Sequence, residues 1–138
     1  MKRYLAFTVA DVNLAIQLDQ VFEVVEVPRI TKVPRPAPHI EGLANLRGKA
    51  VPVLDLRKRF GLINPMTTSQ ARMIIALPGG RGDPMGFIVD SVGEILSVGE
   101  AEGPTHATAP WLDERLLAGT LEVHGRPVLL PDLAKIIE

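Results

Sequence analysis

The sequence predicts an all-β protein made of two similar small barrels, each of about four or five short strands, with one or two short helices. Short apolar runs alternate with polar residues, and 12 glycines and 12 prolines interrupt them. A length of 138 residues fits one compact domain or two very small ones. A pattern of apolar and acidic residues also occurs twice in the same order. Together these observations favour two similar small barrels.

The N-terminal part predicts a hairpin followed by a helical turn and a strand. Residues 4–9 and 14–18 alternate around a short polar turn, as two paired strands do. In residues 19–27 three valines lie three and four positions apart, which suits a helix, but the β-branched content favours a strand. We therefore expect a helical turn that runs into a strand. Three prolines in residues 34–38 predict a loop.

The middle and the C-terminal part predict a second hairpin and one more helical turn. Residues 78–84 are rich in glycine but lack the lysine and hydroxyl ending of a phosphate-binding loop. We interpret them as a wide turn that joins strands at 73–77 and 85–89. Residues 111–117 predict a helical turn. Three phenylalanines are placed like core residues: Phe7, Phe60 and Phe87.

An internal repeat predicts how the domain is organised. Residues 15–24 align with residues 86–95, which lie 71 positions later, and residues 48–58 align with residues 125–135, which lie 77 positions later. We expect a single domain over residues 1–138, with repeat one at about 4–60 and repeat two at about 72–137. One repeat alone would be marginally stable, so the barrels should share strands or a large interface. A groove between them is the expected binding site.

Composition excludes several classes of function. The net charge is -1 and gives no long-range attraction for nucleic acid or an anionic membrane. The absence of cysteine excludes disulfides and thiolate chemistry. No uncharged apolar run reaches the roughly 18 residues of a spanning helix, and the N-terminus lacks the pattern of a signal peptide. We expect a cytoplasmic chain.

The polar residues predict structural roles rather than catalysis. Asp55 and Asp132 each follow an apolar strand, where a carboxylate accepts hydrogen bonds from the first turn of a helix. Asp19 and Asp90 are interpreted in the same way, and residues 91–94 fit a capping box. None of the three histidines, His39, His106 and His124, has the spacing of a metal site. We expect no enzyme, no cofactor and no metal.

Two basic features bear on binding. The run Arg57–Arg59 is interpreted as a solvated helix face. Arg47 lies beside Gly48 where the chain turns, and two alternatives stay open for it. It is either merely exposed, or a carboxylate holds it for use at an interface, with Glu23 and Glu94 as the possible partners.

Two motifs then carry a family resemblance. The stretch from Asn45 to Arg57 has the pattern N-L-R-G-x-x-V-P-V-x-D-L-R, and residues 86–96 read G-F-I-V-D-S-V-G-E-I-L. Together they resemble the CheW family of chemotaxis adaptors, and the resemblance spans about Tyr4 to Ile137. It implies two intertwined five-stranded β-barrels of the SH3 or OB type, in agreement with the repeat.

The resemblance also implies a function and its partners. The family couples methyl-accepting transmembrane chemoreceptors to the histidine kinase CheA in a signalling array. The helical hairpin at the receptor's signalling tip is expected in the groove, and the CheA regulatory domain on exposed barrel surfaces. The chain is then cytoplasmic, is recruited to membrane receptor arrays without inserting, and needs no nucleic acid.

Residues of this chain can be assigned on that basis. The receptor-binding residues implied by the resemblance are Val21, Glu23, Val24, Arg47, Met73 and Ile95. The residues expected to shape turns and helix ends are Gly42, Gly48, Asp55, Gly119, Gly125 and Asp132.

The alternative is a small barrel that binds nucleic acid or oligosaccharide in the same groove. Such a site needs a basic groove and several stacking aromatic side chains. The chain has one tryptophan, one tyrosine and four phenylalanines, which argues against this function.

Overall fold

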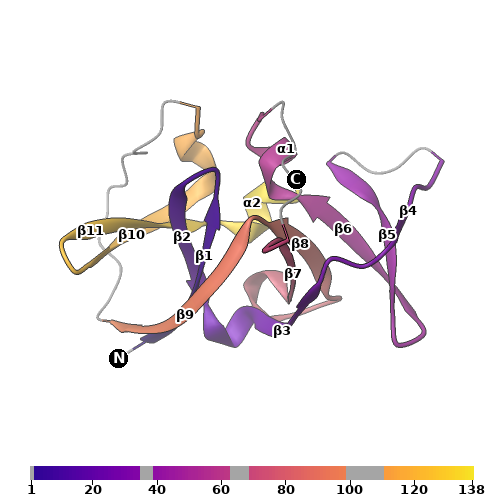
Figure 1. Ribbon diagram of the computed structural model, residues 1–138, viewed down its shortest axis with the longest axis horizontal. Helices are drawn as coiled ribbons and strands as arrows, with labels where there is room; N and C mark the ends of the chain where they lie inside the picture. Colours follow the sequence, from indigo (N-terminus) through magenta and orange to yellow (C-terminus); the bar gives the residue numbers. More distant parts are fainter. Residues whose placement is uncertain (1, 35–38, 63–68, 99–110) are drawn as a thin grey trace.

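The computed structural model describes residues 2–34, 39–62, 69–98 and 111–138. They form two sheets that lie side by side, with the short helices between them (Figure 1). The terminal sheet contains, in spatial order, β10 (Leu117–Val123), β11 (Arg126–Pro131), β2 (Val12–Gln17), β1 (Lys2–Val9) and β9 (Ser91–Val98). The central sheet contains β3 (Val21–Glu26), β7 (Arg72–Ala76), β8 (Met85–Val89), β6 (Lys49–Asp55), β5 (Ile40–Leu46) and β4 (Ile30–Thr31).

Each sheet joins a hairpin from one half of the chain to strands from the other half. In the terminal sheet the β1–β2 hairpin pairs with β9 on one side and, in parallel, with β11 on the other. In the central sheet the β7–β8 hairpin pairs with β3 and, in parallel, with β6. The two strand orders correspond, as a repeat of this chain would require. The duplication itself remains a prediction.

The predicted all-β class with two short helices is confirmed, with one difference in detail. The two sheets fit SH3-like barrels, but in the part of the chain that the structure describes neither ladder of strands closes on itself. The central sheet has six strands rather than five, because the two-residue strand β4 adds to its edge.

One large core lies between the two sheets and holds them together. It takes Phe7 from the terminal sheet, Phe87 from the central sheet and Phe60 from the end of the first helix, and all three are buried as predicted. A smaller cluster lies within each sheet. Burial of one large apolar side chain contributes roughly 1.5–3 kcal/mol. Separating the sheets would expose the largest of the three apolar clusters to water.

The two helices begin as the sequence predicts. Asp55 precedes α1 (Leu56–Arg59), and its side chain accepts a 2.9 Å hydrogen bond from the backbone N–H of Arg57. Asp132 precedes α2 (Leu133–Ile136) and accepts from the backbone N–H of Lys135 at 3.3 Å. Burial raises the pKa of the Asp55 carboxyl above its ordinary value of 3.8, and the bond from Arg57 partly offsets this effect.

Two of the four predicted turn glycines, Gly48 and Gly125, lie in turns, whereas Gly42 and Gly119 lie within strands β5 and β10. Arg47 and Gly48 form the two-residue turn between β5 and β6 with φ values of 50° and 88°. Gly125 lies in the corresponding turn between β10 and β11 with φ of 75°. Positive φ at both central residues defines the type I′ hairpin turn. A Cβ on Gly42 would lie 2.3 Å from the carbonyl oxygen of Thr31, so this glycine admits β4. Gly119 is buried beside a register shift in β10.

The remaining local predictions have mixed outcomes. The helical turn that runs into a strand is confirmed as η1 (Leu18–Gln20) followed by β3, and residues 78–84 do join two antiparallel strands, through η2 (Pro78–Gly80). The predicted turn at 111–117 is helical only over η3 (Glu114–Leu116). The capping box at 91–94 is wrong, because these residues belong to β9. Of the proline-rich loop, residues 35–38 lie outside the described part of the chain. Among the described residues no helix has the length and apolar character needed to span a membrane.

Candidate functional site

Exposed apolar side chains gather on two edge strands. Within the described ranges three large hydrophobic side chains are exposed: Phe22 at 59%, Val24 at 38% and Ile95 at 54%. The first two lie on β3, which ends the central sheet, and the third lies on β9, which ends the terminal sheet. Apolar residues together with unpaired strand edges are typical of surfaces that another chain covers.

A groove runs between these two edges. Its central-sheet wall is formed by Val24, Gln70 and Arg72, and its other wall by Ser91 and Val92 at the start of β9. Its volume is about 510 Å³. We call it the inter-sheet groove, and it matches the predicted location of a binding site between the two similar sheets.

A second depression lies on the central sheet beside the β5–β6 turn, and we call it the hairpin pocket. It has a volume of about 410 Å³. It is lined by Phe22, Leu46, Arg47, Lys49, Val51, Leu77 and Pro84. Phe22 is the extra residue at a register shift between β3 and β7. Such a bulge re-aims a side chain, and Phe22 therefore lines the pocket although it lies on the same strand as the groove residue Val24.

An ion pair borders the hairpin pocket. The Arg47 Nη2 atom donates to Glu23 Oε1 at 2.6 Å, and the two side chains are 66% and 25% exposed. A carboxylate therefore holds Arg47, and of the two candidates it is Glu23. The use of Arg47 at an interface remains a prediction. An exposed pair of this kind contributes only about 0–1 kcal/mol to folding. Its geometry is instead suited to presenting a guanidinium at an interface.

The residues expected to face a receptor do not lie together. Val24 lines the inter-sheet groove, whereas Glu23 and Arg47 lie at the hairpin pocket. Val21 is half-buried and packs against the main core, and Ile95 is exposed on β9. Their role in binding remains a prediction.

Met73 does not fit the expectation that it faces a partner. Its side chain is fully buried on β7, an interior strand of the central sheet, within the cluster that includes Val53 and Ile75. Its sulfur occupies the space over Gly86, where an added Cβ would lie 2.6 Å from it. Met73 is therefore a core residue.

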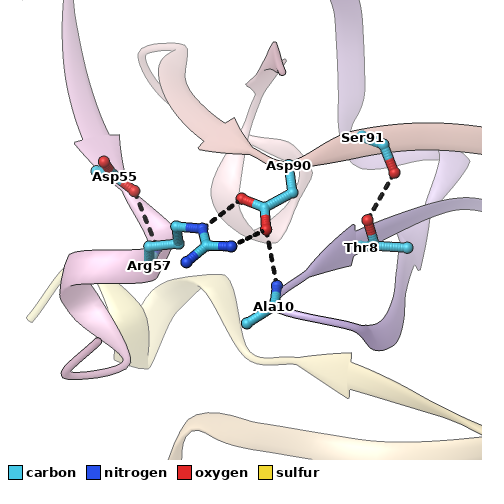
Figure 2. Close-up of polar contacts among 6 residues, drawn as sticks. All are labelled: Thr8, Ala10, Asp55, Arg57, Asp90 and Ser91. Carbon is cyan, nitrogen blue, oxygen red and sulfur yellow. Dashed lines mark hydrogen bonds and ion pairs between the residues drawn. The ribbon is translucent and has the colours of Figure 1, made fainter. Parts of the chain in front are cut away.

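A polar junction that the sequence did not reveal links the two sheets at Asp90 (Figure 2). The Oδ1 and Oδ2 atoms of this carboxylate accept from Arg57 Nε at 2.7 Å and from Arg57 Nη2 at 2.6 Å. Oδ2 also accepts from the backbone N–H of Ala10 at 2.8 Å. We call this set the Asp90 junction. The expectation that Asp90 caps a helix is wrong, since it bonds to a side chain and to a turn of the other sheet.

The basic run is also not the uniform solvated face that we expected. The Arg57 side chain is only 15% exposed, and the Asp90 carboxylate raises its pKa above the ordinary value. Lys58 pairs with Glu41 at 2.9 Å, and Arg59 donates to the carbonyl oxygen of Ile136 at 2.6 Å. The contact between Arg57 and Asp90 follows only from the register of the parallel strands β6 and β8. Asp55 of β6 lies opposite Ile88 of β8, so the residues two positions further on meet.

The described residues offer two contact surfaces, the inter-sheet groove and the hairpin pocket. The described residues contain no cluster of three or more His, Cys, Asp or Glu side chains that could hold a metal. His39 and His124 have positive φ, and His106 lies outside the described part. Phe22 is the one exposed phenylalanine, whereas Tyr4 is buried and the Trp111 ring lies 6.2 Å from that of Phe60. No row of stacking aromatic side chains follows the groove.

Comparison with known proteins agrees with this geometry. The family model of the CheW-like domain matches residues 3–138. The chain is 29% identical over 134 residues to the chemotaxis protein CheW of Thermotoga maritima, which covers 97% of this chain and 86% of that protein. It is 36% identical over 101 residues to CheW of Bacillus subtilis strain 168, which covers 73% of this chain and 64% of that relative.

A solved structure extends the likeness to the fold. The crystal structure of the scaffolding protein TtCheW from Thermoanaerobacter tengcongensis superimposes with a TM-score of 0.87 and 32% identity, covering 99% of this chain and 92% of that one. With the two-sheet fold and a family match over nearly its full length, the chain belongs to the family of CheW-like domains.

Proposed function

We propose that this protein is a non-enzymatic adaptor that couples methyl-accepting chemoreceptors to the histidine kinase CheA. It works in the cytoplasm and is recruited to membrane receptor arrays without inserting. Membership of the family supports a role in chemotaxis. The observation that carries the proposal is the pair of exposed apolar edges, on β3 and β9, that flank the inter-sheet groove.

The receptor's signalling-tip helical hairpin is the proposed occupant of the inter-sheet groove. An amphipathic helix binds by placing its apolar stripe in a hydrophobic groove. Val24 and Val92 supply apolar contacts within the groove, and Ile95 extends them along β9. Each aliphatic side chain that becomes fully covered contributes roughly 1.5–3 kcal/mol.

The CheA regulatory domain is the proposed partner at the hairpin pocket. An adaptor needs two surfaces that can be occupied at once, and strand β3 carries one residue of each, Val24 for the groove and Phe22 for the pocket. Arg47 and Glu23 lie at the pocket. We therefore assign these two residues to the surface for the kinase domain and no longer to the surface for the receptor. A partner that covers this ion pair would make its charges matter more than they do in the free chain.

Titration calorimetry with two fragments tests both assignments. Val24→Asp should weaken binding of the receptor signalling-tip hairpin and spare binding of the CheA regulatory domain, and Arg47→Ala should do the reverse. Thr31→Ala, on the exposed face of β4, is the matched control. Absence of binding of either fragment to the unaltered protein would refute the proposal.

The rival function, binding of nucleic acid or oligosaccharide, is tested with single-stranded DNA at two salt concentrations. A net charge of -1 and a single exposed aromatic ring predict no binding. Salt-sensitive binding at micromolar concentrations would favour the rival.

A further inference from the structure

One carboxylate joins the two sheets where the chain crosses between them. Asp90 is the single residue between the end of β8 in the central sheet and the start of β9 in the terminal sheet. It binds Arg57 of α1, which follows central-sheet strand β6, and Ala10, in the β1–β2 turn of the terminal sheet (Figure 2). Both charged side chains are largely shielded from solvent, at 15% and 18% exposure.

The junction adjoins one wall of the inter-sheet groove. The next two residues, Ser91 and Val92, form one wall of that groove. Ser91 is held further, because its Oγ atom lies 2.6 Å from Oγ1 of Thr8, and the N–H of Asp90 donates to the Thr8 carbonyl at 2.9 Å. The groove wall therefore begins at a residue fixed to both sheets.

The other crossing of the chain is built differently. At η1 the chain passes from β2 of the terminal sheet to β3 of the central sheet, and Asp19 there lies 71 positions before Asp90. Asp19 is exposed, and the position 77 residues after Arg57 is Ala134. This crossing is held through Gln20, whose carbonyl accepts from Leu77 N–H at 2.8 Å. Of the two crossings in the described part of the chain, the one that leads into the groove wall therefore has the Asp90 junction, and the other lacks the equivalent ion pair.

We infer that Asp90 and Arg57 are positioning residues, which fix the β9 wall of the inter-sheet groove relative to the central sheet and so hold it at the width that its helical partner needs. The inference rests on the proposed function. Two parallel charge-assisted bonds fix both distance and orientation. Removal of either charge breaks this ion pair and leaves the other charge shielded from solvent, so the crossing relaxes and the groove samples a wider range of widths.

The test uses the absence of cysteine from this chain. Ala50→Cys on β6 and Glu122→Cys on β10 are exposed positions on different sheets, and spin labels there report the distance between the sheets by pulsed electron resonance. Asp90→Asn, Arg57→Gln and Arg57→Lys are introduced separately. Asp19→Asn, at the corresponding crossing, and Lys58→Ala, on the same helix, are the controls. Binding of the receptor signalling-tip hairpin is measured in parallel without labels, at a temperature where every variant is folded.

If the Asp90 junction fixes the sheets, the distribution of label-to-label distances should be narrow in the parent protein and wider in Asp90→Asn and Arg57→Gln. The dissociation constant of the tip fragment should rise about tenfold in these two variants. Arg57→Lys keeps the charge but cannot make the two parallel bonds of the guanidinium. Its distance distribution and dissociation constant should therefore lie between those of the parent and of Arg57→Gln. Both controls should match the parent.

A merely structural role would lower the melting temperature and leave the distance distribution and the affinity of the folded protein unchanged, and that result would overturn the inference. If Asp90→Asn does not fold, the two Arg57 variants decide. If the parent protein does not bind the tip fragment, the proposed function fails. The distance measurement still decides whether the Asp90 junction fixes the two sheets relative to each other.

Discussion

The hairpin ends of the two sheets share a backbone but differ in their side chains. The turns at Arg47–Gly48 and His124–Gly125 both have positive φ at each residue, and β3 and β9 both carry a register shift at the same place. In the central sheet the shift exposes Phe22 and the turn supplies Arg47, which pairs with Glu23. The corresponding positions of the terminal sheet hold Gly93, His124 and Glu94.

The difference shows that two ends with a similar backbone can present different surfaces. One backbone arrangement occurs twice, and in the described part of the chain only the central end combines an apolar side chain, a cation held by a carboxylate, and a pocket of about 410 Å³. We infer that the shared backbone supplies rigid turns at both ends and that, under the proposed function, the side chains decide which end can bind the kinase domain.

The largest expected effect comes from breaking what both ends share. Phe87 is 2% exposed in the core between the sheets. Phe87→Ala should lower the free energy of unfolding by about 3–5 kcal/mol, because it removes a large buried ring and leaves a cavity. Urea denaturation followed by circular dichroism measures this. A loss below about 1 kcal/mol would mean that the sheets are not joined through this core.

The next effect separates the two ends. Arg47→Ala should weaken binding of the CheA regulatory domain by about 2–5 kcal/mol, because Glu23 is then covered without a partner. Folding should change by no more than about 1 kcal/mol, since the pair is exposed in the free chain. His124→Ala is the matched control and should bind normally by calorimetry. Equal losses from both variants would remove the distinction between the ends.

A third prediction concerns the shared backbone. Gly48→Ala and Gly125→Ala should each cost roughly 1–2 kcal/mol, because alanine is strained at positive φ, and a Cβ at either position meets no atom within 4 Å. Thermal unfolding of both variants measures the effect. Unequal costs would show that the two turns are less alike than their φ values indicate.

The smallest effect concerns the cap of the helix that follows the central hairpin. The raised pKa of Asp55 means that the folded chain holds this proton more tightly than the unfolded chain does. Its contribution therefore favours the fold at low pH and is lost as the pH rises from about 3.8 through the folded value.

Asp55→Asn removes that dependence and keeps an oxygen that can accept from the Arg57 N–H. The variant should be slightly more stable than the parent at neutral pH, with a flatter pH profile of the unfolding free energy across this window. Urea titrations at several pH values test it. A variant that is less stable at neutral pH would show that the charge supports the cap.

What the sequence predicted correctly depends on neighbours along the chain. The caps at Asp55 and Asp132 and the turns at Gly48 and Gly125 follow from residues within a few positions of each other. The partner of Arg47 was one of two carboxylates named from the sequence. The all-β class followed from alternation and from frequent breaks by glycine and proline.

What the sequence missed depends on how strands are ordered. Met73 is buried because β7 lies between β3 and β8, and its own alternation does not reveal an interior strand. Arg57 meets Asp90, 33 positions later, only because β6 and β8 run parallel in one particular register. The bulge at Phe22 directs this side chain to the pocket and away from the groove, and the alternation of the sequence does not reveal a bulge.

The most direct test of the account is an NMR titration of the uniformly ¹⁵N-labelled protein. Addition of the receptor signalling-tip hairpin should shift amide resonances along β3 and β9 and around Ser91 and Val92. Addition of the CheA regulatory domain should shift those of Phe22, Arg47 and Lys49 and leave the His124–Gly125 turn unchanged. Shifts of equal size at both hairpin turns, or none along the groove, would contradict the claim that side chains confine binding to the central end and the inter-sheet groove.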